Sequence, residues 1–195
     1  KVTLSGGSGW SLGPTVQDIV IESCAATDLG GEGIAMASAA GVKDIVINNN
    51  FVNNTSLVFL GQPGAIRLQG QNNVTASHNT IGYVPYAGLM LGWQTGWDAG
   101  AVTNPKFKAE FNNIHNFGLG ILSDFGGIYL SSNDNLCFQK SPSTCYLPTL
   151  VHNNRISGCH HYNYGCNGVY MDEQVSGITI SSNMIQNIMS AGIYF

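Results

Sequence analysis

Residues 79–91, NTIGYVPYAGLML, contain one complete copy of a unit that recurs along this chain. The unit opens with Asn-x-[Ile/Val], reaches a Gly-led apolar segment nine to fifteen residues later, and repeats every 29 to 42 residues. A degenerate earlier copy runs from Ser23 to Met36. The opening asparagines are Asn50, Asn79, Asn112, Asn154 and Asn183, and the glycines are Gly64, Gly88, Gly127, Gly168 and Gly192. Such self-similarity, without any long helical pattern, predicts a solenoid of stacked coils.

A further segment of each unit alternates apolar and polar residues, as at residues 18–22, 44–48, 73–77 and 177–181. Alternation with a period of two is typical of strands with one buried face. Three strands in each coil predict an all-β fold, a right-handed, single-stranded parallel β-helix with about six coils, whose asparagines can hydrogen-bond from coil to coil. We expect residues 1–195 to form one domain. We interpret it as a fragment that is incomplete at the C-terminus, inside the strand ending at Phe195, and also at the N-terminus.

The composition narrows the classes of partner. Hydrophobic residues make up 44% of the chain, so it can bury a core, whereas charged residues make up only 9%. The net charge is −4, with seven Lys and Arg and no basic run, which argues against nucleic-acid binding. No apolar run reaches the roughly 18 residues that a membrane-spanning helix requires.

The cysteines indicate the compartment. Cys137 and Cys145 bracket one short segment, and Cys159 and Cys166 bracket another. Pairs that close short loops are typical of disulfides in an oxidising compartment, so we expect a secreted, extracellular or cell-surface protein. Free thiols in a cytosolic protein remain an alternative, and a zinc site is less favoured because the chain has no Cys-x2-Cys pair. The sequons at Asn53, Asn54 and Asn73 predict N-glycosylation.

The outward positions of the Gly-led strands suggest a binding face. In order along the stack they are Ala35, Arg67, Met90, Tyr129, Tyr170 and Tyr194. Trp93 lies in an adjoining insertion (residues 93–105), and a second insertion covers residues 132–148. Insertions beside one face of a solenoid are typical of its binding side. Aromatic rings and polar groups of this kind suit a sugar, with Arg67, Trp93, Tyr129, Tyr170 and Glu173 as the substrate-binding candidates. An aromatic ladder that only stabilises stacked strands is the alternative interpretation.

Two carboxylates on neighbouring coils are the catalytic candidates. Asp124 precedes one Gly-led strand, and Asp172 ends the next. Glycoside hydrolysis uses such a pair, one as acid and one as base or nucleophile, about 5 to 9.5 Å apart. Seven extended positions would span about 23 Å, so the pair requires a sharp turn after Asp124. Asp98 and Asp134 are competitors for either role, and capping of backbone N–H groups is the structural alternative for each aspartate.

The stretches PYAGLMLGW (85–93), LSDFGGIY (122–129) and NGVYMDE (167–173) resemble the parallel β-helix glycoside hydrolases, a superfamily with fucosidase-like and xylosidase-like members. The resemblance covers roughly residue 65 to the end. It implies that the acidic pair is Asp124 and Asp172, that the substrate is a polysaccharide or glycan, and that neither a cofactor nor a metal is required.

A second hypothesis remains open beside hydrolysis. A non-catalytic β-helix, either glycan-binding or a structural module of an extracellular fibre, would also explain the low charge and the sequons. Its open coil ends would allow end-to-end self-association. A polysaccharide lyase ranks third because the clustered aspartates that hold Ca²⁺ are missing.

Overall fold

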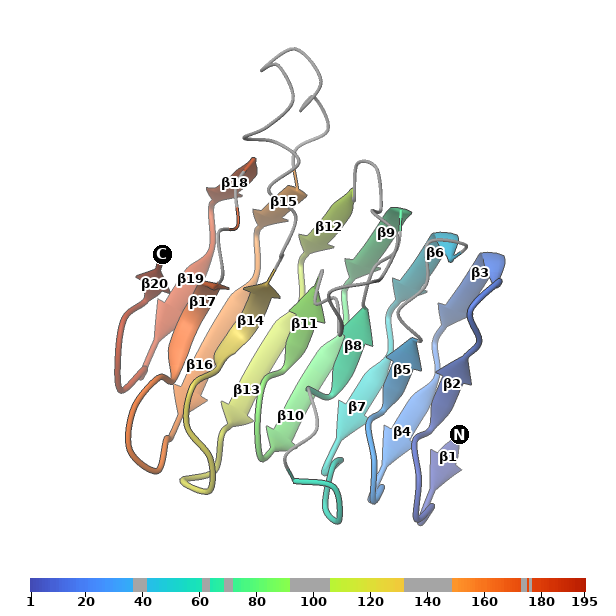
Figure 1. Ribbon diagram of the computed structural model, residues 1–195, viewed down its shortest axis with the longest axis horizontal. Helices are drawn as coiled ribbons and strands as arrows, with labels where there is room; N and C mark the ends of the chain where they lie inside the picture. Colours follow the sequence, from blue (N-terminus) through green and yellow to red (C-terminus); the bar gives the residue numbers. More distant parts are fainter. Residues whose placement is uncertain are drawn as a thin grey trace.

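A computed structural model describes residues 1–36, 42–60, 64–68, 72–91, 106–131, 149–172, 175 and 177–195. These residues form strands and turns but no helix, and the strands assemble into three sheets that run side by side along the molecule (Figure 1). Sheet 1 contains β1 (Val2–Thr3), β4 (Ala25–Thr27), β7 (Phe51–Asn53), β10 (Thr80–Val84), β13 (Asn113–Phe117), β16 (Arg155–Cys159) and β19 (Met184–Gln186).

Sheet 2 contains β2 (Trp10–Leu12), β5 (Ile34–Met36), β8 (Ile66–Leu68), β11 (Leu89–Leu91), β14 (Gly126–Ser131), β17 (Asn167–Asp172) and β20 (Ile193–Tyr194). Sheet 3 contains β3 (Gln17–Glu22), β6 (Lys43–Asn48), β9 (Asn72–Ser77), β12 (Phe107–Glu110), β15 (Thr149–His152) and β18 (Ile178–Ser181). The Gly-led segments supply sheet 2, and the strands after the repeated asparagines supply sheet 1.

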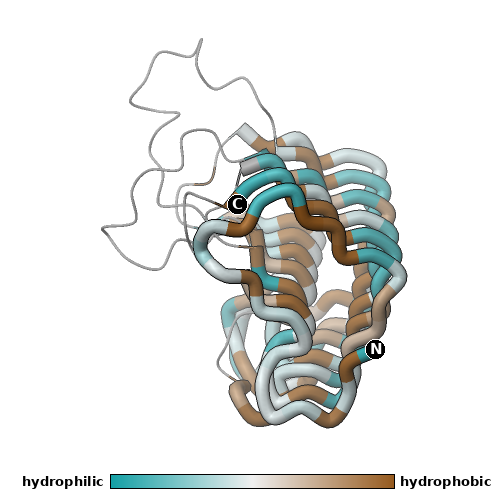
Figure 2. The backbone as a smooth tube through the Cα atoms, turned by 90° about the vertical axis from the view of Figure 1, so that its right-hand side faces the viewer, coloured by the Kyte–Doolittle hydropathy of each residue, from teal (hydrophilic) through white to brown (hydrophobic). Residues whose placement is uncertain are grey.

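Every strand pairs in parallel with its equivalents in the coils before and after it. In sheet 1, for example, Ile81 faces Val52 on one side and Ile114 on the other. Viewed along the axis, the coils lie one behind another (Figure 2). This arrangement confirms the predicted parallel β-helix, in which the coil itself provides the crossover that parallel strands need, and such crossovers are right-handed.

The core fills the coil with aliphatic side chains that recur at the same position in successive turns. Val52, Ile81, Ile114 and Ile156 in sheet 1 are fully buried, and Ile66, Leu89, Ile128 and Val169 form the matching column in sheet 2. Because the side chains of a strand alternate between its faces, each strand contributes one or two such positions. The alternation seen in the sequence therefore corresponds to the real inside and outside of the coil.

The repeated asparagines form a buried ladder inside the turn between sheets 3 and 1. The side-chain amide of Asn79 donates to Asn112 Oδ1 at 3.0 Å and to the carbonyl of Ile47 at 3.0 Å. The same pattern joins Asn50 to Asn79, Asn112 to Asn154, and Asn154 to Asn183. Each oxygen also accepts the backbone N–H of the preceding ladder residue, at 2.9 to 3.0 Å. The ladder thus satisfies backbone groups that the turn would otherwise leave buried without partners.

Each turn of the coil contains a residue in the left-handed region. One column, immediately before the ladder, has φ between 53° and 56° and comprises Ser23, Asn49, His78, Phe111, Asn153 and Ser182. A second column, near the ends of the sheet 1 strands, includes Asp28, Asn54, Tyr83, Asn116 and Asn187, and a third, at the second position of the sheet 3 strands, includes Asp18, Asp44 and Asn73. Asparagine and aspartate tolerate this conformation better than other non-glycine residues. The Asn-rich composition therefore has a conformational cause.

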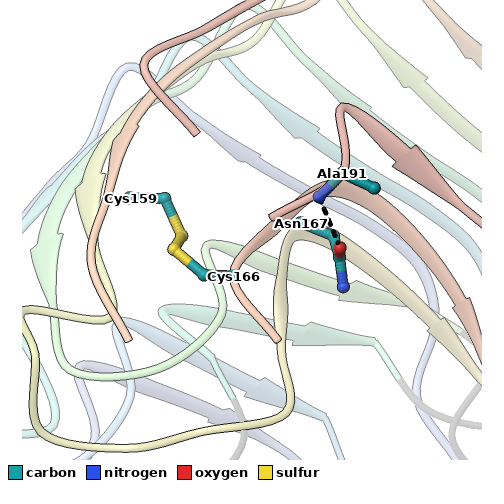
Figure 3. The surroundings of a disulfide bond; sticks show 4 residues. All are labelled: Cys159, Cys166, Asn167 and Ala191. Carbon is teal, nitrogen blue, oxygen red and sulfur yellow. Dashed lines mark hydrogen bonds between the residues drawn. A yellow bond between two sulfur atoms is a disulfide. The ribbon is translucent and has the colours of Figure 1, made fainter. Parts of the chain in front are cut away.

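One predicted disulfide is present. Cys159, at the end of β16, is bonded to Cys166, just before β17 (Figure 3). The adjacent Asn167 accepts a hydrogen bond from the backbone N–H of Ala191 at 3.1 Å, also drawn in Figure 3. Cys137 and Cys145 lie outside the described residues, and Cys24 is a free thiol. The described segments include no helix with the length and apolarity that crossing a membrane would require.

Candidate functional site

Two tyrosines of sheet 2 form the centre of the site. Tyr129 of β14 and Tyr170 of β17 are in register, and their rings stack with centroids 4.9 Å apart and planes 2° from parallel. We expected an open aromatic surface at this position. Instead, Tyr129 is 1% exposed and Tyr170 is 9% exposed. The rings therefore offer little free face to a sugar, and the polar ends of the side chains are the part that can take part in chemistry.

The two candidate aspartates bind these tyrosines crosswise. The hydroxyl of Tyr129 donates to Asp172 Oδ2 at 2.6 Å, and the hydroxyl of Tyr170 donates to Asp124 Oδ1 at 3.0 Å. Each tyrosine is thus bonded to the aspartate of the other coil. Both aspartates are half-buried. Two hydrogen bonds and one stacked ring pair therefore connect the two carboxylates.

A sharp turn places Asp124 beside the tyrosines. Asp124 has φ of 66°, and its backbone N–H donates to the carbonyl of Tyr164 in the next coil at 3.0 Å. Gly165 follows with φ of 85°, and a Cβ there would lie 2.5 Å from the Asp124 nitrogen. Gly126 packs against Tyr170 in the same way, since its Cβ would lie 2.8 Å from that of Tyr170. The glycines of this turn therefore allow the close approach that brings Asp124 to Tyr170.

Tyr86 completes the group, and the sequence interpretation did not single it out. Its hydroxyl donates to the backbone carbonyl of Asp124 at 2.6 Å. Its ring lies 5.3 Å from that of Phe125 and 6.2 Å from that of Tyr129. The only signal in the sequence was its place in the PYAGLMLGW stretch, two residues before a repeat glycine. We refer to Tyr86, Tyr129, Tyr170, Asp124 and Asp172 as the tyrosine–aspartate cluster.

Burial and the aspartate charges keep the three phenols protonated. Burial raises the pKa of Tyr129 far above its ordinary value, and the hydrogen bond to Asp172 raises it further. Burial, followed by the hydrogen bond to Asp124, raises the pKa of Tyr170. Burial and then the charge of Asp124 raise the pKa of Tyr86. At neutral pH the three phenols are therefore neutral hydroxyl donors, Tyr129 and Tyr170 to the two carboxyl groups and Tyr86 to the backbone carbonyl of Asp124.

Arg67 belongs to a different part of sheet 2. Its position in β8 is in register with Met90, and Met90 is in register with Tyr129, so about 10 Å of stacked strands separate Arg67 from the tyrosine. Arg67 instead forms an ion pair with Glu32, a residue that the sequence interpretation missed. The register matches the predicted order of the outward column, Arg67, Met90 and Tyr129, and a substrate-binding role for Arg67 stays a prediction.

Four of the sequence candidates cannot be placed. Trp93, Glu173, Asp98 and Asp134 lie outside the described residues, as do the two insertions around the expected groove. Within the described ranges, no group of three or more His, Cys, Asp or Glu is placed to hold a metal ion.

Three all-parallel sheets around an asparagine ladder define a parallel β-helix protein. No family model matches the chain, and no curated protein matches it. Among solved structures, it is similar to the A-module of the mannuronan C-5 epimerase AlgE6 from Azotobacter vinelandii, with a TM-score of 0.61 and 17% sequence identity. The similarity covers 99% of this chain and 48% of the epimerase chain, so this chain spans about half the length of that structure. At this identity the likeness establishes the fold alone.

Proposed function

We propose that this protein acts on a polysaccharide and hydrolyses a glycosidic bond with Asp124 and Asp172. The observation that carries the proposal is the meeting of two half-buried carboxylates from successive coils on one tyrosine pair. Such a pair has the composition that glycoside hydrolysis uses. One carboxyl gives its proton to the leaving oxygen as the glycosidic bond breaks. The other activates water or attacks the sugar carbon, and water supplies the group that replaces the leaving sugar.

The tyrosines contribute orientation in this mechanism. Tyr129 and Tyr170 each donate a hydrogen bond to one carboxyl oxygen, and each bond fixes the position of that oxygen. Tyr86 holds the backbone of Asp124 rather than its carboxyl group. Positioning of this kind is valuable because small displacements of catalytic groups reduce rates strongly.

The structural neighbour supports a polysaccharide as the substrate class, since its name describes an epimerase acting on mannuronan. It gives no support to hydrolysis over other reactions. The activity assay therefore follows the appearance of reducing ends and, by NMR, any change of sugar configuration in the same samples.

The proposal includes an extracellular or cell-surface location. The Cys159–Cys166 disulfide supports an oxidising compartment. Among the three sequon asparagines, Asn73 is exposed at the start of β9, whereas Asn53 and Asn54 are half-buried. The hydroxyl residues of the Asn53 and Asn54 sequons, Thr55 and Ser56, are buried. We propose Asn73 as the principal glycan site, and a peptide map before and after enzymatic deglycosylation tests it.

Substitution of the aspartates tests hydrolysis. Asp124→Asn and Asp172→Asn should each reduce turnover by several orders of magnitude on the polysaccharide that the wild type cleaves, with little change in substrate binding. Asp18→Asn, an exposed carboxylate in sheet 3, serves as the matched control and should retain full activity. Retention of wild-type turnover by both cluster variants would remove the carboxylate pair as the catalytic group.

One observation favours a second function, a non-catalytic structural or glycan-binding β-helix. Tyr129 is almost completely buried, and both carboxylates are bonded to tyrosines, as they would be in a purely structural cluster. Under this alternative the wild type releases no reducing ends from any glycan it binds, and the aspartate variants lose stability instead.

A further inference from the structure

A pocket lies away from the tyrosine–aspartate cluster, near the first coils. Gly7, Ser8, Gly31, Glu32 and Phe59 line it. Phe59 belongs to the turn between β7 and β8 and is 51% exposed, so one part of its ring faces solvent. Its backbone N–H donates to the carbonyl of Gly30 at 3.0 Å, which fixes the turn against the preceding coil. The pocket therefore combines an anchored aromatic ring with a polar floor.

Glu32 supplies the charge of that floor and is held by a partly buried ion pair with Arg67. The Glu32 side chain is 7% exposed, and the Arg67 side chain is 20% exposed. Arg67 Nε donates to one Glu32 oxygen and its terminal nitrogen lies 3.4 Å from the other, while Ser8 Oγ donates to that second oxygen at 3.2 Å. Burying such a pair costs desolvation energy and is weak evidence for a purely stabilising role. Its position under an open pocket indicates a role in recognising a polar ligand.

Glycines keep the pocket open. A Cβ on Gly31 would lie 2.9 Å from the Ser8 nitrogen and 3.0 Å from the Gly7 carbonyl carbon. A Cβ on Gly30 would lie 2.3 Å from the Gly6 oxygen. Any larger residue in this part of the second coil would push into the coil beneath it. At Gly30 and Gly31 the second coil thus approaches the backbone of the first coil closely.

We propose that this pocket is a subsite for a neutral sugar unit. The exposed face of Phe59 suits the C–H face of a sugar ring, and the oxygens of Glu32 and Ser8 can bond its hydroxyls. An acidic sugar is disfavoured because Glu32 already neutralises Arg67, the only cationic residue among the described strands of sheet 2. A bound carboxylate would face the Glu32 charge, which repels it.

The interpretation of this pocket as a substrate subsite rests on the proposed function. Glu32 lies two residues before the start of β5. The distance from β5 to β14 is three strand spacings, about 14 Å. A chain of several sugars running along sheet 2 would therefore reach both the pocket and the tyrosine–aspartate cluster. The inference is that the substrate is a neutral glycan, which differs from the mannuronan that the structural neighbour's name describes.

Calorimetric titration with defined oligosaccharides tests the subsite. The probes are the hexamers of β-1,4-linked xylose, glucose and mannose, together with an anionic hexamer of mannuronate. We expect at least one neutral hexamer to bind, and Phe59→Ala to weaken that binding about tenfold. Val58→Ala, which removes an exposed apolar side chain of the same turn that does not line the pocket, should change it less than twofold. Glu32→Gln should strengthen binding of the anionic hexamer at low salt, because it removes the negative charge that opposes this ligand.

The outcomes separate the two proposals. If no neutral hexamer binds, or if Phe59→Ala and Val58→Ala bind equally, the subsite is refuted. If Asp172→Asn abolishes turnover while Phe59→Ala leaves both affinity and KM unchanged, the proposed function stands and only the subsite fails. If Phe59→Ala weakens binding but the wild type releases no reducing ends, the subsite stands and hydrolysis fails.

Discussion

Replacing Asn112 by alanine removes the central rung of the asparagine ladder. Asn112 is 1% exposed. Its amide nitrogen donates to the carbonyl of Ala76 at 2.9 Å and to Asn154 Oδ1 at 3.0 Å. Its oxygen accepts both the backbone N–H and the side-chain amide of Asn79, each at 3.0 Å. Asn154 Oδ1 would still accept the backbone N–H of residue 112 after the change. The other groups would lose their partner.

The structure gives the size of the effect. The Ala76 carbonyl, the Asn79 backbone N–H and the Asn79 side-chain amide each lose a buried hydrogen bond. Each such group costs about 1–3 kcal/mol, so the free energy of unfolding should fall by about 3 kcal/mol or more. For a chain of this length, that corresponds to a decrease in Tm of about 6–12 °C. The loss should be concentrated in neighbouring coils, because each coil of a solenoid contacts only the next.

Urea unfolding, with hydrogen exchange to locate the loss, measures this effect. Asn113→Ala, the adjacent half-buried residue that points outward from β13, should change stability by no more than about 0.5 kcal/mol. Asn183→Ala, where the ladder is only half-buried and water can reach the freed groups, should cost about 1 kcal/mol. If Asn112→Ala costs no more than Asn183→Ala, the ladder does not stabilise the coil through satisfaction of buried groups.

Three further predictions concern the cluster and its supports. Gly165→Ala should displace Asp124 and reduce activity more than tenfold. Gly120 has φ of 71° but open space where a Cβ would lie, so Gly120→Ala should lose stability only through backbone strain and keep its activity. Equal activity of the two variants in the reducing-end assay would contradict the role assigned to Gly165. The raised pKa values of Tyr86, Tyr129 and Tyr170 mean that the folded state resists losing these protons; stability should be constant below about pH 10, the ordinary tyrosine pKa, and should fall above it. Tyrosinate absorbance should then show these three phenols ionising only as the protein unfolds, and their titration within the folded protein near pH 10 would refute their burial. Removing the Cys159–Cys166 disulfide in the Cys159→Ser/Cys166→Ser variant should lower the free energy of unfolding by about 2 kcal/mol in urea titrations, because the bond closes a short loop. An unchanged unfolding midpoint would show that the disulfide does not stabilise the folded protein.

The fold could be predicted from the sequence because its determinants are local and repeated. Each coil places an asparagine, an aliphatic residue and a glycine at equivalent positions, and a regular stack makes equivalent positions coincide. Asn79 and Asn112, which are 33 residues apart, can therefore be paired from the repeat pattern alone. The burial of the tyrosines could not be predicted in this way. It depends on Tyr86 and Phe125, which lie in turns that differ from coil to coil.

The partners of the charged residues could not be predicted from the repeat pattern either. Glu32 and Arg67 are 35 residues apart, and strand register pairs Arg67 with Ala35, three residues after Glu32, so the repeat pattern does not reveal the ion pair. The spacing of Asp124 and Asp172 around their glycines suggested a wide separation. In the structure both aspartates bind one stacked tyrosine pair, and Asp124 adopts a left-handed conformation beside Gly165 of the following coil. Contacts that depend on turn conformation, rather than on strand register, are the ones that periodicity does not reveal.

The outward column of sheet 2 relates this geometry to function. Along the axis its residues change from small side chains at Ser11 and Ala35, through Arg67 and Met90, to Tyr129, Tyr170 and Tyr194. A column selected only for strand stacking would gain from similar side chains along its whole length, as the asparagine ladder does. The change in character divides the column into an early part, where Arg67 supports a pocket, and a late part, where the tyrosines hold two carboxylates. An extended ligand lying parallel to the axis, such as the polysaccharide that we propose, would meet both parts in order.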